Sequence, residues 1–509
     1  MSGYLLAHDL GTSGDKATLF DTDGHLLASV TEFYDTNYFD GVCAEQNPLD
    51  WWKAFCSANR RLLQQVDSSK LLAVSFSGQM QGLLCVDKNG TPLRDFIIWA
   101  DVRASKQTDR LAQKVTPREL YLTTGHPMNS SYTLEKLMWV MDHEPEVYRN
   151  TYKILSAKDY LIFRLTGKYV MDYSNGSATN AMDINQFCWS ASLADGAGVD
   201  LEKFPTLCEA TDVAGEVPAS LAEETGLPAG TKIVVGGGDG QCASVGAGAY
   251  MEGTTYISAG SSSWISTSSH TAVFDDDMTI TNFAHIVPGY VCPSGTMQTA
   301  GSAFKWLKDT ICLDEISRAE ATGKSPYDFI NAQIAASPAG ANGLLFLPYL
   351  MGERAPRWNP NAKGTLVGLS LSTTRGDIFR SVIEGIGLNL NVILETLQHD
   401  IDITKMSIIG GMARSNEVCQ TYADIMKMDI VRLGNMDEVC SMGAAVAAGV
   451  GVGAFPDFSA IERFSSVESV SHPIAENMAV YDRMKPLFNQ AYFDYVSLFA
   501  NMSQMQEGK

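Results

Sequence analysis

Alternating apolar and polar positions predict short strands joined by tight turns at the start of the chain. The segment YLLAHDL over 4–10 is followed by a Gly-Thr-Ser-Gly turn and by KATLFD over 16–21. A second turn at Gly24 leads into HLLASV over 25–30. Strands connected in this way predict an antiparallel β-meander.

Helical periodicity begins after this meander. Asn47 followed by Pro48 suits an N-cap and a first helical position, so we expect an amphipathic helix that runs to about Val66. The apolar segment LLAVSFSG over 71–78 predicts the next strand. Strands and long helices alternate through the rest of the chain, which favours an α/β fold with mixed sheets.

The opening pattern recurs near the middle of the chain. TTYISAGSSSWISTSS over 254–269 again reads as a strand, a corner of glycine and small hydroxyl residues, and a strand. A duplicated architecture is a natural explanation, although one matched pair of turns is weak support for a repeat. We therefore predict two domains, 1–252 and 253–509, whose corners face each other across a cleft.

Composition and charge narrow the function. The chain has 509 residues, 45% of them apolar, and a formal net charge of −21. This acidic surface would repel nucleic acid and anionic membranes, so we expect neither as a partner. A phosphate-bearing ligand would have to be held by local features, namely backbone N–H groups, a bound cation or a single lysine.

Cysteine usage and hydropathy indicate a cytoplasmic protein. The ten cysteines form no Cys-x-x-Cys pair, and the eight histidines show no metal-ligand spacing, so we expect reduced thiols. The first ten residues lack the pattern of a signal peptide, and no apolar run approaches the ~18 residues of a membrane span. The apolar stretch Gly443–Phe455 is short and rich in Gly and Ala, which predicts a packed helix.

The first stretch with candidate chemistry is DLGTSG over 9–14. Asp9 ends an apolar strand, the two glycines let the backbone approach an anion, and the hydroxyl residues add donors. Lys16 places a positive charge on the next strand. An ordinary glycine-rich hairpin explains the stretch equally well. It is not a P-loop, because no helix follows and the Gly-Lys-Ser/Thr ending is missing.

Three further stretches join it. GGGDGQ over 236–241 follows the strand TKIVV and surrounds Asp239 with glycine, so that a hydroxyl and a phosphate could both come close. An Asp in a tight turn is the plainer alternative. The others are the corner at 260–263 and IIGGMARSN over 408–416, where a flat adenine could lie against a glycine pair before a helix capped by Ser415.

Together these motifs resemble the FGGY carbohydrate kinases, relatives of hexokinase, actin and the heat-shock chaperone ATPases. Two longer stretches strengthen the likeness: SYTLEKLMWVMDH over 131–143, with the family's spacing of Lys136 and Trp139, and GTLVGLSLSTTRGDIFRSVIE over 364–384. The resemblance covers about residues 4–455. It implies two actin-like, ribonuclease H-like domains, each a mixed β-sheet flanked by helices, with a cleft between them.

The resemblance also implies ATP and Mg²⁺ as cofactors. Asp239 would be the catalytic carboxylate and, together with Asp9, would hold the metal. The residues expected at ATP are Gly11, Thr12, Ser13, Lys16, Gly260, Ser261, Ser262, Gly301, Gly410, Gly411, Met412 and Asn416. Phosphoryl transfer needs alignment more than a strong base, and with a reference pKa of about 3.9 we expect Asp239 to be ionised at neutral pH.

The acceptor side resembles the xylulokinases within the family, so the expected substrate is a small sugar, D-xylulose, converted to D-xylulose 5-phosphate. The residues expected at the sugar are Gln79, Met80, Gln81, Trp99, Asp101, Arg103, Asp239 and Gln241. Xylulokinases usually carry His at the position of Gln81 and Asn at that of Gly240, which keeps ribulose, erythritol, gluconate and glycerol open. His8 also stands where an apolar residue is usual.

Two alternatives come from other functional classes. The same duplicated core could serve as a non-transferring ATP-binding module of the actin or chaperone type, or as a catalytically silent sugar-binding protein. The presence of Asp9, Lys16, Asp239 and a sugar loop argues against both. The sequence does not fix the oligomeric state, and a homodimer is left open.

Overall fold

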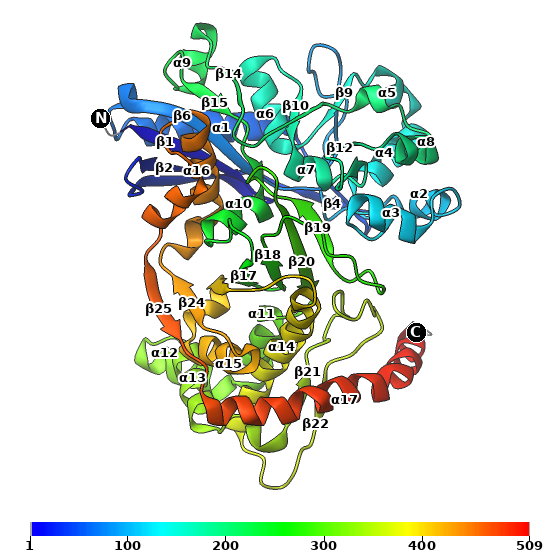
Figure 1. Cartoon of the computed structure of the whole chain (residues 1–509), viewed down its shortest axis with the longest axis vertical. Helices are drawn as coiled ribbons and strands as arrows, with labels where there is room; N and C mark the ends of the chain where they lie inside the picture. Colours follow the sequence, from blue (N-terminus) through cyan, green and yellow to red (C-terminus); the bar gives the residue numbers. More distant parts are fainter. Residues whose placement is uncertain (1–2, 508–509) are drawn as a thin grey trace.

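The computed structural model describes residues 3–507. The N-terminal half is built around a mixed sheet whose strands are blue and green in the upper part of Figure 1. Its strands lie in the order β14 (Val213–Glu216), β15 (Lys232–Val234), β6 (Leu71–Gly78), β1 (Tyr4–Leu10), β2 (Gly14–Asp21) and β3 (Leu26–Phe33), and β16 (Gly237–Gly238) pairs with β6. β1, β2 and β3 are successive antiparallel neighbours, which confirms the predicted meander.

The C-terminal half repeats this plan. Its strands lie in the order β19 (Thr281–Ala284), β20 (Val291–Met297), β18 (Ser263–Thr267), β17 (Thr254–Ala259), β23 (Lys405–Ile409), β24 (Ile430–Leu433) and β25 (Val467–Ser471). In both sheets a run of antiparallel strands is followed by two parallel strands and one antiparallel strand, although in the second sheet β20 lies between β18 and β19, so that run is not a simple meander. The duplicated architecture with mixed sheets is therefore confirmed.

Short strands and helices surround the two sheets. The short strands are β4 (Asn37–Phe39), β5 (Cys43–Gln46), β7 (Leu84–Val86), β8 (Phe96–Ile97), β9 (Lys153–Leu155), β10 (Val170–Asp172), β11 (Met182–Asp183), β12 (Cys188–Trp189), β13 (Thr206–Cys208), β21 (Leu345–Leu347) and β22 (Thr365–Val367). The helices include α2 (Ser105–Leu111), α3 (Pro117–Thr124), α4 (Thr133–His143), α5 (Pro145–Asn150), α6 (Ala157–Thr166), α7 (Tyr173–Ser177), α8 (Ala191–Ala197), α9 (Ala222–Thr225), α11 (Gly301–Ile311), α12 (Leu313–Thr322), α13 (Pro326–Ala336), α14 (Arg375–Gln398), α15 (Asn416–Met426) and α17 (Ala475–Glu507).

The first helix, α1 (Pro48–Leu63), shows how local chemistry sets an element. The Asn47 side chain caps it by accepting the Leu49 N–H at 3.0 Å, and Pro48 takes the first helical position, as predicted. The helix ends at Leu63, three residues before the predicted end. Trp51 and Phe55 are fully buried in the same core as alternate residues of β1, so α1 covers one face of the first sheet.

Two helices lie between the sheets and position the site. α10 (Asp239–Gly246) and α16 (Val439–Gly451) pack on Leu5 and Ala7 of β1, and Tyr256 and Ile409 of the second sheet join the same core (Figure 1). The pair can approach closely because a Cβ at Gly443 would lie only 2.0 Å from the Cys242 carbonyl oxygen. The predicted packed helix is thus confirmed.

The chain does not divide cleanly in space. α16 belongs to the C-terminal half of the sequence but contacts β1 and β6 of the first sheet. The boundary at 252/253 therefore stays a prediction, and residues 1–2 and 508–509 of the two predicted domains lie outside the described residues. Among residues 3–507, no helix combines the length and the apolar character that a bilayer span needs. The ten cysteines are free thiols, as expected.

Candidate active site

The site begins at one edge of the first sheet, where three strands end. Asp9 pairs in register with Ser77 of β6, and Ser77 pairs with Gly237 of β16. The strands are parallel, so their carboxyl ends meet at the same edge. The Ser77 hydroxyl donates to Asp9 Oδ1 at 2.8 Å, which orients the Asp9 carboxylate.

Asp239 follows directly as the first residue of α10. Its carboxylate is half-buried, and Oδ1 accepts the Gly240 N–H at 2.8 Å. The glycine before it is required by packing, since a Cβ at Gly238 would lie 2.4 Å from the sulfur of Met80. Met80, expected at the acceptor, therefore lies against the backbone that leads into Asp239.

The two carboxylates influence each other. Burial and, after it, the negative charge of Asp9 together raise the pKa of Asp239 to about 7. Burial also raises the pKa of Asp9, against the hydrogen bond from Ser77 and the charge of Lys16. A pKa near 7 differs from the expectation, based on the reference pKa, that Asp239 is ionised at neutral pH.

A divalent cation fits this pair of carboxylates. Among residues 3–507 no cluster of three or more His, Cys, Asp or Glu side chains is arranged to hold a metal. Mg²⁺ keeps several waters and needs only one or two protein carboxylates when phosphate oxygens complete its shell. A cation would also relieve the repulsion between Asp9 and Asp239.

The first glycine corner, residues 10–14, is fixed by its neighbours. Gly11 N–H donates to the Gly14 carbonyl at 3.0 Å. The Thr12 carbonyl accepts from Gln46 Nε2 at 2.7 Å, and the Thr12 hydroxyl accepts from Trp99 Nε1 at 3.0 Å. A side chain expected at the sugar thus touches the corner expected at phosphate.

Two predicted ligands near this corner are engaged within the protein. The Gln79 side chain is buried and donates to Gln46 Oε1 at 2.8 Å, so it supports the corner from behind. The Lys16 ammonium lies 3.2 Å from Glu438 Oε2 and also contacts the Asp437 carbonyl. Both acidic residues belong to the turn before α16.

The second glycine corner, residues 259–262, borders a cavity of about 550 Å³, which we call the corner cavity. Gly301 N–H donates to the Gly260 carbonyl at 2.9 Å, and Ser302 donates to the Ser261 carbonyl through N–H and hydroxyl. Gly410 has a φ of +96°, and a Cβ there would lie 2.7 Å from the Ala259 carbonyl oxygen. Ser262 completes the turn into β18.

The lining of the corner cavity includes predicted and unpredicted residues. It comprises Ala259, Gly260, Ser261, Gly301, Phe304, Lys305, Ser325, Tyr327, Asp328, Asn331, Gly411, Met412, Arg414 and Ser415. The residues on α13 were missed by sequence reasoning. The Ser325-Pro326 pair signals the start of that helix, but nothing in the sequence brings it beside the glycine corner. Asn416 does not line this cavity, because its Oδ1 accepts from Arg432 at 2.9 Å.

A second cavity, of about 300 Å³, lies between the halves, and we call it the interlobe cavity. It is lined by Gln81, Trp99, Ala100, Val102, Pro127, Asn129, Ser131, Tyr132, Thr279, Thr281, Phe283, Thr296, Arg354, Ala355 and Trp358. Gln81 and Trp99 were predicted acceptor residues, and Trp99 is 46% exposed. The lining from 279–358 was missed because no sequence signal links that segment to the N-terminal half.

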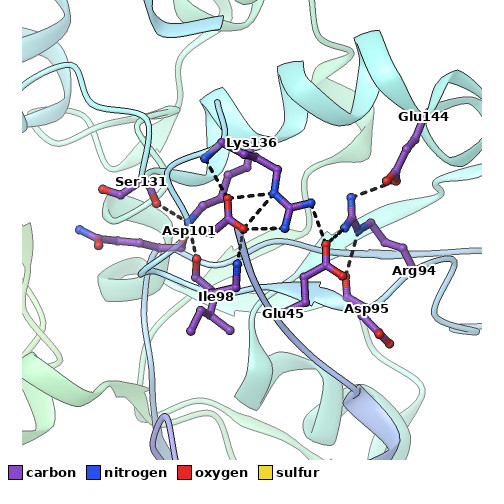
Figure 2. Close-up of polar contacts among 11 residues, drawn as sticks. Glu45, Arg94, Asp95, Ile98, Asp101, Ser131, Lys136 and Glu144 are labelled. Atoms are coloured by element: carbon purple, nitrogen blue, oxygen red, sulfur yellow. Dashed lines mark hydrogen bonds and ion pairs between the residues drawn. The ribbon is translucent and has the colours of Figure 1, made fainter. Parts of the chain in front are cut away.

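Asp101 and Arg103 do not line the interlobe cavity. Asp101 is fully buried and Arg103 is partly buried; Arg103 donates to Asp101 Oδ2 at 2.6 Å, and its other terminal nitrogen lies 2.7 Å from Glu45. Figure 2 shows Asp101 and Glu45 in this network. Arg94 joins the same network through Glu45 and Glu144. None of these charged residues is part of the lining of the interlobe cavity. Gln241, on α10, is also buried, and its Oε1 has no hydrogen-bond partner among the described residues.

Comparison with known proteins places this geometry in a family. Residues 4–246 match the N-terminal domain, and residues 255–452 the C-terminal domain, of the FGGY family of carbohydrate kinases. A xylulose kinase of Staphylococcus epidermidis is 32% identical over 502 residues, covering 98% of each chain. A gluconokinase of Bacillus subtilis is 28% identical over 490 residues, covering 96% of this chain and 95% of that protein.

Solved structures give the same result. Gluconate kinase from Lactobacillus acidophilus superimposes with a TM-score of 0.91 at 27% identity, covering 99% of this chain and all of that one (100%). The ligand-bound xylulose kinase from the same organism reaches 0.90 at 27% identity, covering 98% and 99%. FGGY kinases are ATP-dependent phosphotransferases that act on small sugars. The chain therefore belongs to the FGGY family of carbohydrate kinases.

Proposed function

We propose that this kinase transfers the γ-phosphate of ATP to a terminal hydroxyl of a pentulose, converting D-xylulose to D-xylulose 5-phosphate. The observation that carries the proposal is the coupled pair Asp9 and Asp239, one at the end of β1 and one at the start of α10. Met80 packs on Gly238, directly before Asp239, and the next residue, Gln81, lines a cavity formed by both halves. Xylulose kinases predominate among the similar proteins and support the choice of acceptor.

The reaction depends on alignment and on electrostatic stabilisation. The phosphoryl group passes through a loose transition state, so the acceptor hydroxyl needs orientation and a late proton acceptor rather than a strong base. Asp239 supplies both, and its raised pKa lies near the working pH, where a general base is most effective. Met80 fixes the backbone before it by packing on Gly238.

The remaining roles follow from the two corners. Asp9 and Asp239 would hold Mg²⁺ through water, and the cation would neutralise charge on the phosphate oxygens. Backbone and hydroxyl groups of Thr12, Ser13, Ser261 and Ser262 would face the phosphates, while the corner cavity would take adenosine. Lys16 would reach a phosphate only by leaving Glu438.

An ADP-release assay with Mg²⁺ across D- and L-pentuloses, tetritols, glycerol and gluconate tests the proposal. We expect the highest kcat/KM with D-xylulose and little ATP turnover without an acceptor. ATP turnover that no sugar stimulates would favour the non-transferring ATP-binding module. Sugar binding without ADP release would favour the catalytically silent protein.

One observation favours gluconate as a second candidate acceptor. The Arg354 guanidinium lines the interlobe cavity, and among residues 3–507 it has no ion-pair partner, while its buried Nε has no hydrogen-bond acceptor. Burial lowers the pKa of Arg354 although the negative charge of Glu353 acts against this shift, so a substrate carboxylate would stabilise the guanidinium further.

The Arg354→Gln variant separates the two acceptors. If the substrate is a sugar acid, its kcat/KM falls ~10-fold or more, because the charge-assisted hydrogen bond is worth about 1.5–3 kcal/mol. With D-xylulose the loss is expected to stay within about threefold. A wild-type enzyme that prefers gluconate would replace the pentulose proposal and keep the kinase.

A further inference from the structure

Lys136, on α4, is a buried lysine that has no part in the proposed reaction described above. Its side chain is fully buried, and its Nζ donates to the Gln81 carbonyl at 2.9 Å, to the Ile98 carbonyl at 2.8 Å and to the Ser131 carbonyl (Figure 2). An ammonium has three N–H donors and no acceptor. Its whole hydrogen-bonding capacity is therefore used on three backbone oxygens.

These oxygens belong to three separate segments of the interlobe cavity wall. Gln81 and Ser131 line the cavity themselves, and Ile98 directly precedes Trp99, which also lines it. The segments come from different parts of the chain and meet only through the fold. One ammonium thus sets their relative positions.

One of the segments is strained without such a partner. Gln81 has a φ of +63°, a left-handed conformation that residues with a side chain rarely adopt. Such a conformation persists only when the surroundings enforce it. The hydrogen bond from Lys136 to the Gln81 carbonyl is a contact that does so.

A comparison with the other buried lysine shows that Lys136 is unusual. Lys158 is also fully buried, but its ammonium forms ion pairs with Asp159 at 2.8 Å and Asp172 at 2.7 Å. No carboxylate among the described residues lies within ion-pair distance of Lys136, since nearby Asp101 is bound to Arg103. Burying a cation without a carboxylate partner is costly, and burial lowers the pKa of Lys136 to about 7, so the three backbone carbonyls are the contacts that stabilise this ammonium.

From these contacts we infer that Lys136 is a positioning residue for the acceptor: it holds the 81, 98 and 131 segments in the arrangement that binds the sugar, without touching the sugar. The inference rests on the proposed function for the identity of the interlobe cavity as the acceptor site. It assigns a physical role to a residue of the 131–143 signature.

The test compares Lys136→Met with Arg94→Met. Both variants remove a largely buried cation from the same region, but Arg94 binds Glu45 and Glu144 and contacts none of the three carbonyls. We expect Lys136→Met to raise the KM of the preferred acceptor at least tenfold and to leave the KM of ATP within about threefold. Arg94→Met should change neither KM by more than about threefold at a comparable loss of Tm. Equal acceptor KM values in the two variants would overturn the inference.

Lys136→Arg separates geometry from charge. It keeps the positive charge, but a planar guanidinium cannot direct N–H groups at three carbonyls around one nitrogen. We therefore expect a raised acceptor KM here too. A wild-type KM in Lys136→Arg would show that only the charge matters and would overturn the inference. This variant also carries the test if Lys136→Met fails to fold.

A second readout does not depend on which sugar is phosphorylated. Hydrogen exchange of the backbone around 79–83, 97–100 and 129–132 should be faster in Lys136→Met or Lys136→Arg than in wild type, and unchanged in Arg94→Met. If wild type phosphorylates no acceptor but this pattern holds, the proposed function fails and the positioning role stands. Unchanged exchange in the Lys136 variants would remove the positioning role alone.

Discussion

The two cavities are built by different means. The corner cavity is formed where glycine backbone and small hydroxyl residues meet, and its walls come from the C-terminal half of the chain alone. The interlobe cavity draws its walls from both halves, and the buried ammonium of Lys136 hydrogen-bonds to three of the segments that form it. The corner cavity depends on positions without side chains. The interlobe cavity depends on a side chain, that of Lys136, which does not line it.

This difference teaches how each site fails. A glycine corner is lost when a single Cβ intrudes, since backbone cannot move aside. A wall whose segments share one hydrogen-bond donor is lost when that donor is removed, because the carbonyls of Gln81, Ile98 and Ser131 then lose their common partner in a medium of low polarity. Asp9 and Asp239 line neither of these two cavities, and we expect them to have the largest effect on the rate.

The largest effect is expected from Asp239→Asn. The amide keeps the shape of the carboxylate but cannot accept the proton, so kcat should fall by ~10²–10⁴-fold, as steady-state kinetics with the preferred acceptor would measure. Acceptor affinity measured by calorimetry should persist. A near wild-type kcat would remove Asp239 from the mechanism.

The next effect concerns pH. Because the folded-state pKa of Asp239 is raised to about 7, the base form is lost as the pH falls below 7, whereas an ordinary Asp would lose it near pH 4. We expect kcat/KM for the acceptor to fall about tenfold per pH unit below pH 7. The apparent pKa read from this profile is a property of the coupled Asp9–Asp239 pair and not of either residue alone. A higher Mg²⁺ concentration should shift this fall in kcat/KM to lower pH. A kcat/KM that does not change between pH 5 and 8 would contradict the coupling of Asp9 and Asp239.

A smaller effect tests the corner cavity with two adjacent glycines. Gly410→Ala places a Cβ 2.7 Å from the Ala259 carbonyl oxygen at a φ of +96°, whereas a Cβ at Gly411 meets nothing within 4 Å. We expect Gly410→Ala to lower the free energy of unfolding by about 1–3 kcal/mol and to raise the KM of ATP ~10-fold. Gly411→Ala, measured by the same urea titration, should stay within about 0.5 kcal/mol of wild type. Equal stabilities would argue against this close backbone approach.

The smallest effect tests the hydrogen bond between Trp99, which lines the interlobe cavity, and Thr12 of the first glycine corner. Trp99→Phe removes the N–H that donates to the Thr12 hydroxyl, so the acceptor KM should rise ~2–10-fold, the value of one net hydrogen bond. A double-mutant cycle with Thr12→Val should give a coupling of about 0.5–1.5 kcal/mol. Additive effects would show that the hydrogen bond contributes nothing to binding.

Sequence reasoning was strongest where chemistry depends on backbone geometry. The strands around DLGTSG, the capped start of α1 at Asn47 and the recurrence of the corner at Gly260 all follow from local patterns. The carboxylates of Asp9 and Asp239 could be singled out because glycine surrounds them. Their meeting could not, since it depends on the register of β1, β6 and β16.

It was weakest where polar side chains lie close together in the sequence. Gln79, Asp101 and Arg103 have the composition of sugar ligands, but Gln79 supports Gln46, and Asp101 and Arg103 pair with each other. A polar residue next to a cavity can face the ligand or the wall, and sequence does not distinguish the two. For the same reason, sequence reasoning did not identify Arg354 and Tyr132 as residues that line the interlobe cavity.

The sequence alone determined the α/β class, the duplicated architecture, the glycine corners and the family, because each depends on residue types at fixed spacing. Only the tertiary structure decided which polar groups face a cavity and that Asp9 raises the pKa of Asp239. It alone also showed that one buried ammonium joins three segments of the cavity wall. These properties depend on distance and burial, which arise when segments remote in sequence pack against one another.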